Sequence, residues 1–278
     1  MPERKNEIFE GKSALDAQGA MGGGDGPFEV PIIDVPLPSG GVTYPEGNPL
    51  SGQSMVTITT MTAAQENILT NRSLAKRGTL LTHLIQSCLK DKRIRAKELL
   101  IGDRNTIMVA LRISGYHAEY DVKIECPACE EQTRQKFMLD ALPVRRLELQ
   151  PINPGMNQFE FMLPMSRKRV VFRFLTGIEE EEIAQTQAQK KKVGNIDAEL
   201  VTSGLLHTII SLDGITDRSR LASVLPQMPA FDSRALRSYI QDNEPGMQLK
   251  GEMECEHCGH AGEVDVPLGP DFFWPKTK

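Results

Sequence analysis

The chain has 278 residues, 40% of them hydrophobic, which is enough for one sizeable core and a satellite core because domains usually contain about 100 to 200 residues. Its formal net charge of −5 provides no overall basic field to attract nucleic acid. There is no apolar run long enough to span a membrane, and the N-terminus MPERKNEIFEGK lacks the apolar core of a signal peptide. We therefore expect a protein made in a reducing cytoplasm, without a nucleic-acid partner or a membrane span.

Residues 1–36 predict an extended arm. They contain GAMGGGDGPF followed by EVPIIDVP, which has no helical or strand period. The glycines at 22–26 follow no strand, so they indicate a flexible joint and not a phosphate-binding loop. Two alternatives stay open for the arm: a disordered tail, or a segment that becomes ordered on a partner.

The next stretch predicts a loop at 38–52, a strand at 55–61 and three helices. Thr62 and Gln65 have the spacing of a capping box, which places a helix start between them. In the second helix, within 79–90, apolar residues recur every three or four positions and form one buried stripe: Leu80, Leu81, Leu84, Ile85, Cys88 and Leu89. Cys88 is interpreted as a core thiol and not as a metal ligand. Asp103 is expected to be the N-cap of the third helix, in preference to a catalytic carboxylate.

Four of the five cysteines form two CxxC pairs, Cys126 with Cys129 and Cys255 with Cys258. In a cytosolic chain, two such pairs supply the four thiolates of a closed tetrahedral zinc site. Each pair is flanked by alternating residues, within 120–139 and 247–268, which predicts two β-hairpins pinching one structural zinc ion between their tips. His257 and His260 are alternative ligands, although each CxxC is complete without them.

A catalytic metal would need an open coordination position, which four protein thiolates do not leave. No nucleophile elbow, phosphate-binding loop or HExxH motif is present either. The sequence therefore favours a protein that is not an enzyme.

Between the two hairpins, the patterns predict strands at 145–150, 158–163 and 167–175, and helices at 178–192, 197–211 and 232–242. The predicted fold class is α+β: a mainly helical N-terminal region and a zinc-ribbon-like hairpin pair, interrupted by a small α+β insert. The expected parts are the arm 1–36, the helical region with the first hairpin 37–142, the insert 143–247, and the second hairpin with an aromatic tail 248–278.

The tail ends in Phe272, Phe273 and Trp274, which are candidate partner-docking residues. Each ring can bury about 150–250 Å², and soluble monomers avoid exposing such a group. Two alternatives are equally open: packing on this chain's own hairpins, or docking into a neighbouring subunit.

Several stretches together resemble the baseplate hub and hub-assembly proteins of T-even-like contractile-tailed phages. They cover most of the chain after residue 36, and they are LPSGGVTYP (37–45), KRGTLLTHLIQSCLKD (76–91), LLIGDRNTIMVALRISGYHAEYDVKIECPAC (99–129), LPMSRKRVVFRFLTGIEEEEI (163–183), MPAFDSRALRSYIQDNEPGM (228–247) and CEHCGHAGEVDVPLGPDFFWP (255–275).

The resemblance implies a structural protein of the virion, located in the tail baseplate near its central hub and assembled in the host cytoplasm. The implied partners are other baseplate and hub subunits, with further copies of this chain as another option. Other readings stay open: a transient hub-assembly chaperone, a zinc-ribbon nucleic-acid-binding protein, or a cell-wall hydrolase at a tail tip.

Overall fold

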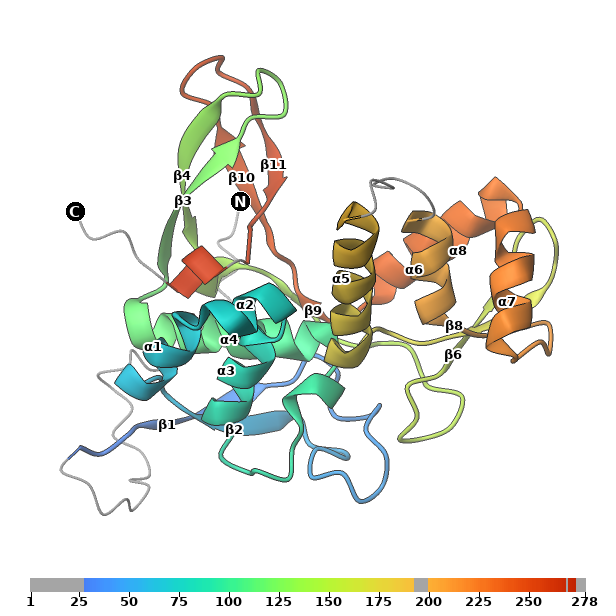
Figure 1. Ribbon diagram of the computed structural model, residues 1–278, viewed down its shortest axis with the longest axis horizontal. Helices are drawn as coiled ribbons and strands as arrows, with labels where there is room; N and C mark the ends of the chain where they lie inside the picture. The colour runs from blue at the N-terminus through green and yellow to red at the C-terminus, as the bar shows by residue number, and fades with distance from the viewer. Residues whose placement is uncertain (1–27, 193–199, 269, 274–278) are drawn as a thin grey trace.

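The computed structural model describes residues 28–192, 200–268 and 270–273, and its fold is α+β, with helices and small antiparallel sheets (Figure 1). Residues 1–27 of the predicted arm, 197–199 of a predicted helix, and Trp274 lie outside the described residues. In the described ranges, no helix has the length and apolar content needed to cross a membrane.

The first part of the chain forms a two-stranded sheet, four helices and a hairpin. Its strands and helices are β1 (Ile32–Pro36), β2 (Met55–Thr59), α1 (Ala63–Leu69), α2 (Arg72–Arg77), α3 (Leu80–Cys88), α4 (Ile101–Tyr116), β3 (Glu119–Glu125) and β4 (Gln132–Met138). β1 pairs antiparallel with β2, and Val35 lies opposite Val56. The end of the predicted arm is therefore a strand, a correction that the isolated sequence could not supply because β1 has too few residues to show a period.

The predicted capping box starts α1 as expected. The Thr62 side chain accepts from the Ala64 N–H at the helix start, and the Gln65 side chain accepts from the Thr62 N–H. The following short helix, α2, begins at the N-cap Asn71 and ends at Gly78, which has φ 72° in the left-handed region that favours glycine. Local sequence thus determines both helix boundaries.

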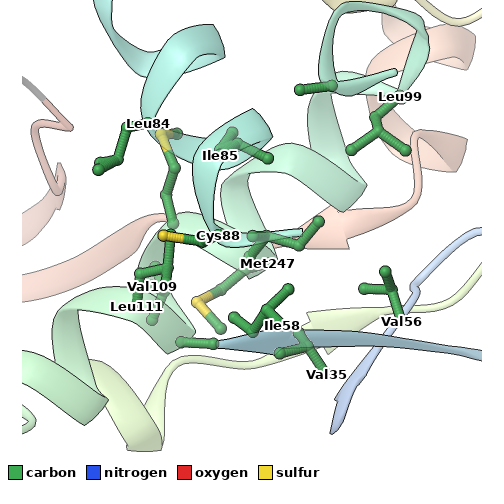
Figure 2. Packing of buried hydrophobic residues seen from close by; sticks show 14 of the residues in the cluster. Val35, Val56, Ile58, Leu84, Ile85, Cys88, Leu99, Val109, Leu111 and Met247 are labelled. Carbon is green, nitrogen blue, oxygen red and sulfur yellow. The ribbon is translucent and has the colours of Figure 1, made fainter. Parts of the chain in front are cut away.

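The main apolar core lies between α3, α4 and the β1–β2 sheet (Figure 2). The predicted stripe of α3 places Leu84, Ile85 and Cys88 in this core, each with no exposed surface. Burial raises the pKa of the Cys88 thiol, so the group stays neutral and packs as a small apolar side chain. Cys88 is a core thiol, as predicted.

Asp103 is not an N-cap, contrary to the prediction. The N-cap of α4 is Leu100, and Asp103 lies inside the first turn with no exposed surface. Its carboxylate accepts from the Ser39 N–H at 3.0 Å, from the Ser39 hydroxyl at 2.6 Å and from the Tyr44 hydroxyl at 2.6 Å. Burial raises the pKa of Asp103, while the Ser39 and Tyr44 donors favour its charged form. Asp103 therefore fastens the loop 37–53 to α4.

The remaining elements of the chain form the insert and the second hairpin. They are β5 (Val144–Arg145), β6 (Phe159–Met162), β7 (Arg169–Phe172), α5 (Gly177–Lys192), α6 (Leu200–Thr208), β8 (Ile209–Leu212), α7 (Arg218–Val224), α8 (Ala230–Asn243), β9 (Gly246–Met247), β10 (Lys250–Glu254) and β11 (Ala261–Asp265). In the insert, β6, β7 and β8 form one antiparallel sheet in that order. A second apolar core includes Phe159, Phe172, Phe174 and Leu236.

Two predictions within the insert need correction, and one helix was missed. The strand expected at 145–150 is limited to Val144–Arg145, which pairs with β9. The helix expected at 197–211 ends at Thr208, because Ile209–Leu212 joins the sheet as β8. Helix α7 was not predicted at all. The sequence of a short apolar run does not show whether the run forms a helix or a strand. Pairing with a neighbouring strand decides between the two.

The segment of the insert between β7 and α5 is fixed to the start of α4. The Ile101 N–H donates to the Leu175 carbonyl, and the Gly177 N–H donates to the Leu99 carbonyl. The Arg104 guanidinium, almost fully buried, bonds to the Thr82 hydroxyl of α3 at 3.0 Å and pairs with Glu180 of α5 at 3.1 Å. One turn of helix therefore connects α3, α4 and α5.

The exit of the insert returns to the same turn. A Cβ built on Gly102 would lie 1.7 Å from the Pro245 carbonyl oxygen and 2.9 Å from the Gly246 Cα. Only a residue without a side chain allows this backbone approach. Gly102 thus sets the distance between α4 and the segment that leads to the second hairpin.

We predict that Gly102→Ala lowers the free energy of unfolding by at least about 3 kcal/mol, because backbone atoms must separate to admit a methyl group. Urea unfolding followed by circular dichroism measures the change. The matched control is Gly204→Ala in α6, where a Cβ meets nothing within 4 Å. This control should be neutral or stabilising by up to about 1 kcal/mol. Equal effects of the two substitutions would contradict the steric explanation.

Candidate metal centre

The two CxxC turns lie at the far ends of two hairpins that project side by side from the body of the protein (Figure 1). β3 pairs with β4 in the first hairpin, and β10 pairs with β11 in the second. The hairpins are joined by the Gln135 side chain, which donates to the Glu254 carbonyl at 2.7 Å. A Cβ on Gly251 would lie 2.4 Å from the Phe137 ring, so these strands pack at the closest distance that glycine permits.

The two turns have the same backbone hydrogen bonds. In the first, the Cys126 N–H donates to the Glu131 carbonyl at 2.9 Å, and the Glu130 N–H donates to the Cys126 carbonyl at 2.8 Å. In the second, the N–H groups of Cys255 and Gly259 make the equivalent bonds, to the carbonyls of His260 and Cys255, at 2.8 and 2.9 Å. Glu130 and Gly259 occupy equivalent positions, with φ 60° and φ 69°. Two segments with different sequences therefore form one local structure.

The four cysteine sulfurs converge on a single point between the turns. All four lie within 4.8 Å of one another. The Sγ atoms of Cys126 and Cys258 are 3.7 Å apart, and so are those of Cys129 and Cys255. A tetrahedral ion with metal–sulfur bonds of about 2.3 Å requires sulfur–sulfur separations of about 3.8 Å. The predicted ligand set is thus compatible with a tetrahedral metal site.

Backbone N–H groups favour the thiolate form of two of these cysteines. Burial tends to raise the pKa of the Cys126 thiol, but the N–H groups of Ala128 and Cys129 outweigh it and lower this pKa to about 7. The Cys258 N–H lowers the pKa of Cys255 in the same way. Thiolates are the form that binds metal ions. For the other two thiols the balance is opposite. The Glu131 N–H lowers the pKa of Cys129, but burial and the neighbouring thiols outweigh it and raise this pKa to about 12. The His260 N–H lowers the pKa of Cys258, but burial and the thiols of Cys255 and Cys126 outweigh it and raise this pKa.

The alternative ligands are not part of this cluster. Among the described residues, the group able to hold an ion contains four cysteines and neither His257 nor His260. Cys88 lies in the main core and not between the hairpin tips.

The C-terminal aromatic residues begin inside the protein. Phe272 and Phe273 are fully buried in the main core, and the Phe272 ring meets the Tyr120 ring edge-on with centroids 5.0 Å apart. The sequence left open whether these rings pack within the chain or dock into a neighbouring subunit. The rings of Phe272 and Phe273 pack within the chain. Trp274, the third candidate docking residue, is outside the described residues.

Arg112 of α4 holds this C-terminal turn, a role that sequence reasoning missed. Its side chain is fully buried and donates to the carbonyls of Phe272 at 2.8 Å, His117 at 2.8 Å and Glu119 at 3.1 Å. A signal was available, because Arg112 directly follows Leu111 and lies four residues after Met108, inside the apolar stripe of the helix. An arginine at such a position has to find buried acceptors.

A family model described as T4 bacteriophage base plate protein matches residues 37–274. No curated protein and no solved structure matches the chain.

We predict that Arg112→Met lowers the free energy of unfolding by about 2 kcal/mol, because three carbonyls, one of them buried, lose a charged donor. Urea unfolding gives the magnitude, and hydrogen exchange should show faster exchange at residues 270–273. Arg134→Met is the control: Arg134 is half-exposed and pairs with Asp121, so its loss should cost less than about 1 kcal/mol. Unchanged exchange at 270–273 in Arg112→Met would contradict the anchoring role.

Proposed function

The chain belongs to the T4 bacteriophage base plate protein family, and we propose that it is a structural component of the central hub region of a contractile tail baseplate. The family match carries this proposal, because it extends over 37–274 and so includes both CxxC pairs and the whole insert. The hub location itself rests on the resemblance of the individual motifs. The protein acts through contacts with other baseplate subunits and performs no catalysis.

The proposed cofactor is one structural zinc ion bound by Cys126, Cys129, Cys255 and Cys258. The sulfur separations of 3.7 Å and the backbone donors to the thiolates support this assignment. Bound zinc would supply electrostatic cross-linking of four thiolates and nothing reactive. Structural zinc in small domains contributes about 10–16 kcal/mol of apparent binding free energy, which is comparable with the stability of a whole domain.

The proposed division into a helical region (37–142), an insert (143–247) and a second hairpin (248–278) agrees with two separate apolar cores. The main core takes residues from both ends of the described chain, including Val35 and Phe273. The second core is built almost wholly from the insert. A baseplate subunit has to keep its shape under mechanical load, and zinc would cross-link the hairpin tips, where the apolar cluster is small.

Of the three aromatic docking candidates, we assign partner docking to Trp274 alone. Phe272 and Phe273 are used inside the chain, so their contribution is to hold the terminus in place. A tryptophan next to such an anchor is a suitable hot-spot residue for a subunit contact.

We predict that Cys126→Ser and Cys255→Ser each lose about one equivalent of zinc per chain and aggregate, because the two hairpins lose their cross-link. Zinc is measured by atomic emission on the purified protein, and aggregation by light scattering. Cys88→Ala is the matched control: it removes a thiol from the main core, so it should lower stability and retain zinc. Zinc content equal to wild type in both serine variants would remove the zinc assignment.

The hub proposal is tested in the particle. Mass spectrometry of purified tails should detect this chain at a fixed ratio to other baseplate proteins, whereas a transient chaperone would be absent from finished tails. Trp274→Ala should keep normal zinc content and melting temperature but enter tails at a reduced level. A variant that assembles as well as wild type would refute docking through Trp274. Salt-sensitive binding of the purified protein to DNA would support the nucleic-acid alternative instead.

A further inference from the structure

The insert presents two apolar side chains that are largely exposed. Met165 follows β6, and its residue surface is 65% exposed; Phe231, in the first turn of α8, is 64% exposed. A single exposed apolar residue is ordinary on a protein surface, but a methionine and a phenylalanine held together form an anchor of the kind found at protein interfaces.

A buried carboxylate ties the backbone of Met165 to the helix that carries Phe231. Asp232, with no exposed surface, accepts from the Met165 N–H at 2.8 Å and from the Ser166 N–H at 3.0 Å. These bonds tie the β6–β7 turn to the start of α8, so neither anchor lies on a free loop. A surface fixed before contact loses little conformational entropy on binding.

Basic residues follow each of the two anchors closely in the sequence. Arg167, Lys168 and Arg234 are exposed, and no ion pair among the described residues contains any of them. The segments 162–169 and 228–237 contain a single acidic residue, Asp232, whose carboxylate is already used. We call Met165, Phe231 and these three basic residues the insert-end patch. Its chemistry fits an apolar contact surrounded by negative charge.

The opposite pattern occurs at the tips of the zinc-ribbon-like hairpins, residues 125–132 and 254–261, called here the hairpin tip. Pro127 and Ala128 are exposed at its end. Around them the two segments contain no lysine or arginine and have five exposed glutamates: Glu125, Glu130, Glu131, Glu254 and Glu256. The hairpin tip is thus a small apolar projection in an acidic setting, which complements the insert-end patch in both apolarity and charge.

The two surfaces face different directions within one molecule. In this view the hairpins project upward from the body, and the insert extends to the right of α4 (Figure 1). We propose that the hairpin tip of one copy docks on the insert-end patch of a second copy. Such a contact joins two different surfaces, so it is heterologous and generates a ring or a continuing row of subunits. It concerns this chain alone and does not require the hub assignment.

The contact is small, because it uses one turn of the insert and two tight turns of the hairpins. An interface of this size is weak by itself and depends strongly on charge attraction. Self-association should therefore appear at high protein concentration and low salt, and it should diminish as salt is added.

Sedimentation velocity of the zinc-loaded full chain at about 50 mM salt tests the proposal. Arg167→Glu with Lys168→Glu should weaken self-association by about tenfold or more, and Glu130→Lys with Glu131→Lys should do the same. A mixture of these two double variants should associate again, because the reversed charges match. Residue 130 has φ 60°, and a lysine in this left-handed backbone is as strained as the native glutamate. The substitution Glu130→Lys therefore changes only the charge.

The matched control is Arg72→Glu with Lys76→Glu, the same charge change on the exposed surface of α2, which should associate like wild type. Carbodiimide cross-linking of mixed ¹⁵N-labelled and unlabelled protein should join Lys168 to Glu130 or Glu131 between isotopically different chains. A monomer at all concentrations up to about 200 µM, an equal loss in the control, or no recovery on mixing would overturn the proposal. Zinc content and entry into tails are measured separately, so this failure leaves the proposed function intact.

Discussion

The first turn of α4 is the constraint on which the rest of the structure depends. Four consecutive residues each fix a different part of the chain there: the Ile101 backbone bonds the segment between β7 and α5, Gly102 admits the insert exit, Asp103 binds the loop 37–53, and Arg104 joins α3 to α5. None of these contacts is replaceable by generic apolar packing. The Asp103 and Arg104 charges are buried and have to be satisfied, and Gly102 leaves no room for a side chain.

Patterns that act over a few residues were predictable from the sequence. The capping box at Thr62, the α3 stripe with Cys88 and the two CxxC hairpins depend on spacing alone, and the structure confirms all three. Contacts between distant segments were not predictable. Asp103 has the residue type and position of a helix cap, but only the folded loop with Ser39 and Tyr44 reveals its partners, and β8 becomes a strand only because β7 lies beside it.

In the candidate metal centre, too, local patterns were predictable from the sequence and contacts between distant segments were not. The four cysteines that converge could be named from their spacing, because a metal site requires residue types in number and order. What could not be inferred is how the C-terminus returns to the core. The Arg112 bond to the Phe272 carbonyl crosses 160 residues of sequence, and nothing local to either residue records it. Two hairpins with unrelated side chains also adopt one backbone geometry, because hydrogen bonds within the turn determine it.

The composition of the main core has a consequence for the order of events during synthesis. Met247, Val266, Phe272 and Phe273 fill that core alongside residues made far earlier, such as Val35 and Leu84. The N-terminal region therefore cannot complete its packing until residues 247–273 have left the ribosome. The second core comes from one continuous stretch apart from Leu100, so the middle of the chain has the means to fold first. Until residues 247–273 are available, an already folded insert is attached to two unfinished halves of one core, and those halves are the part that needs protection from aggregation.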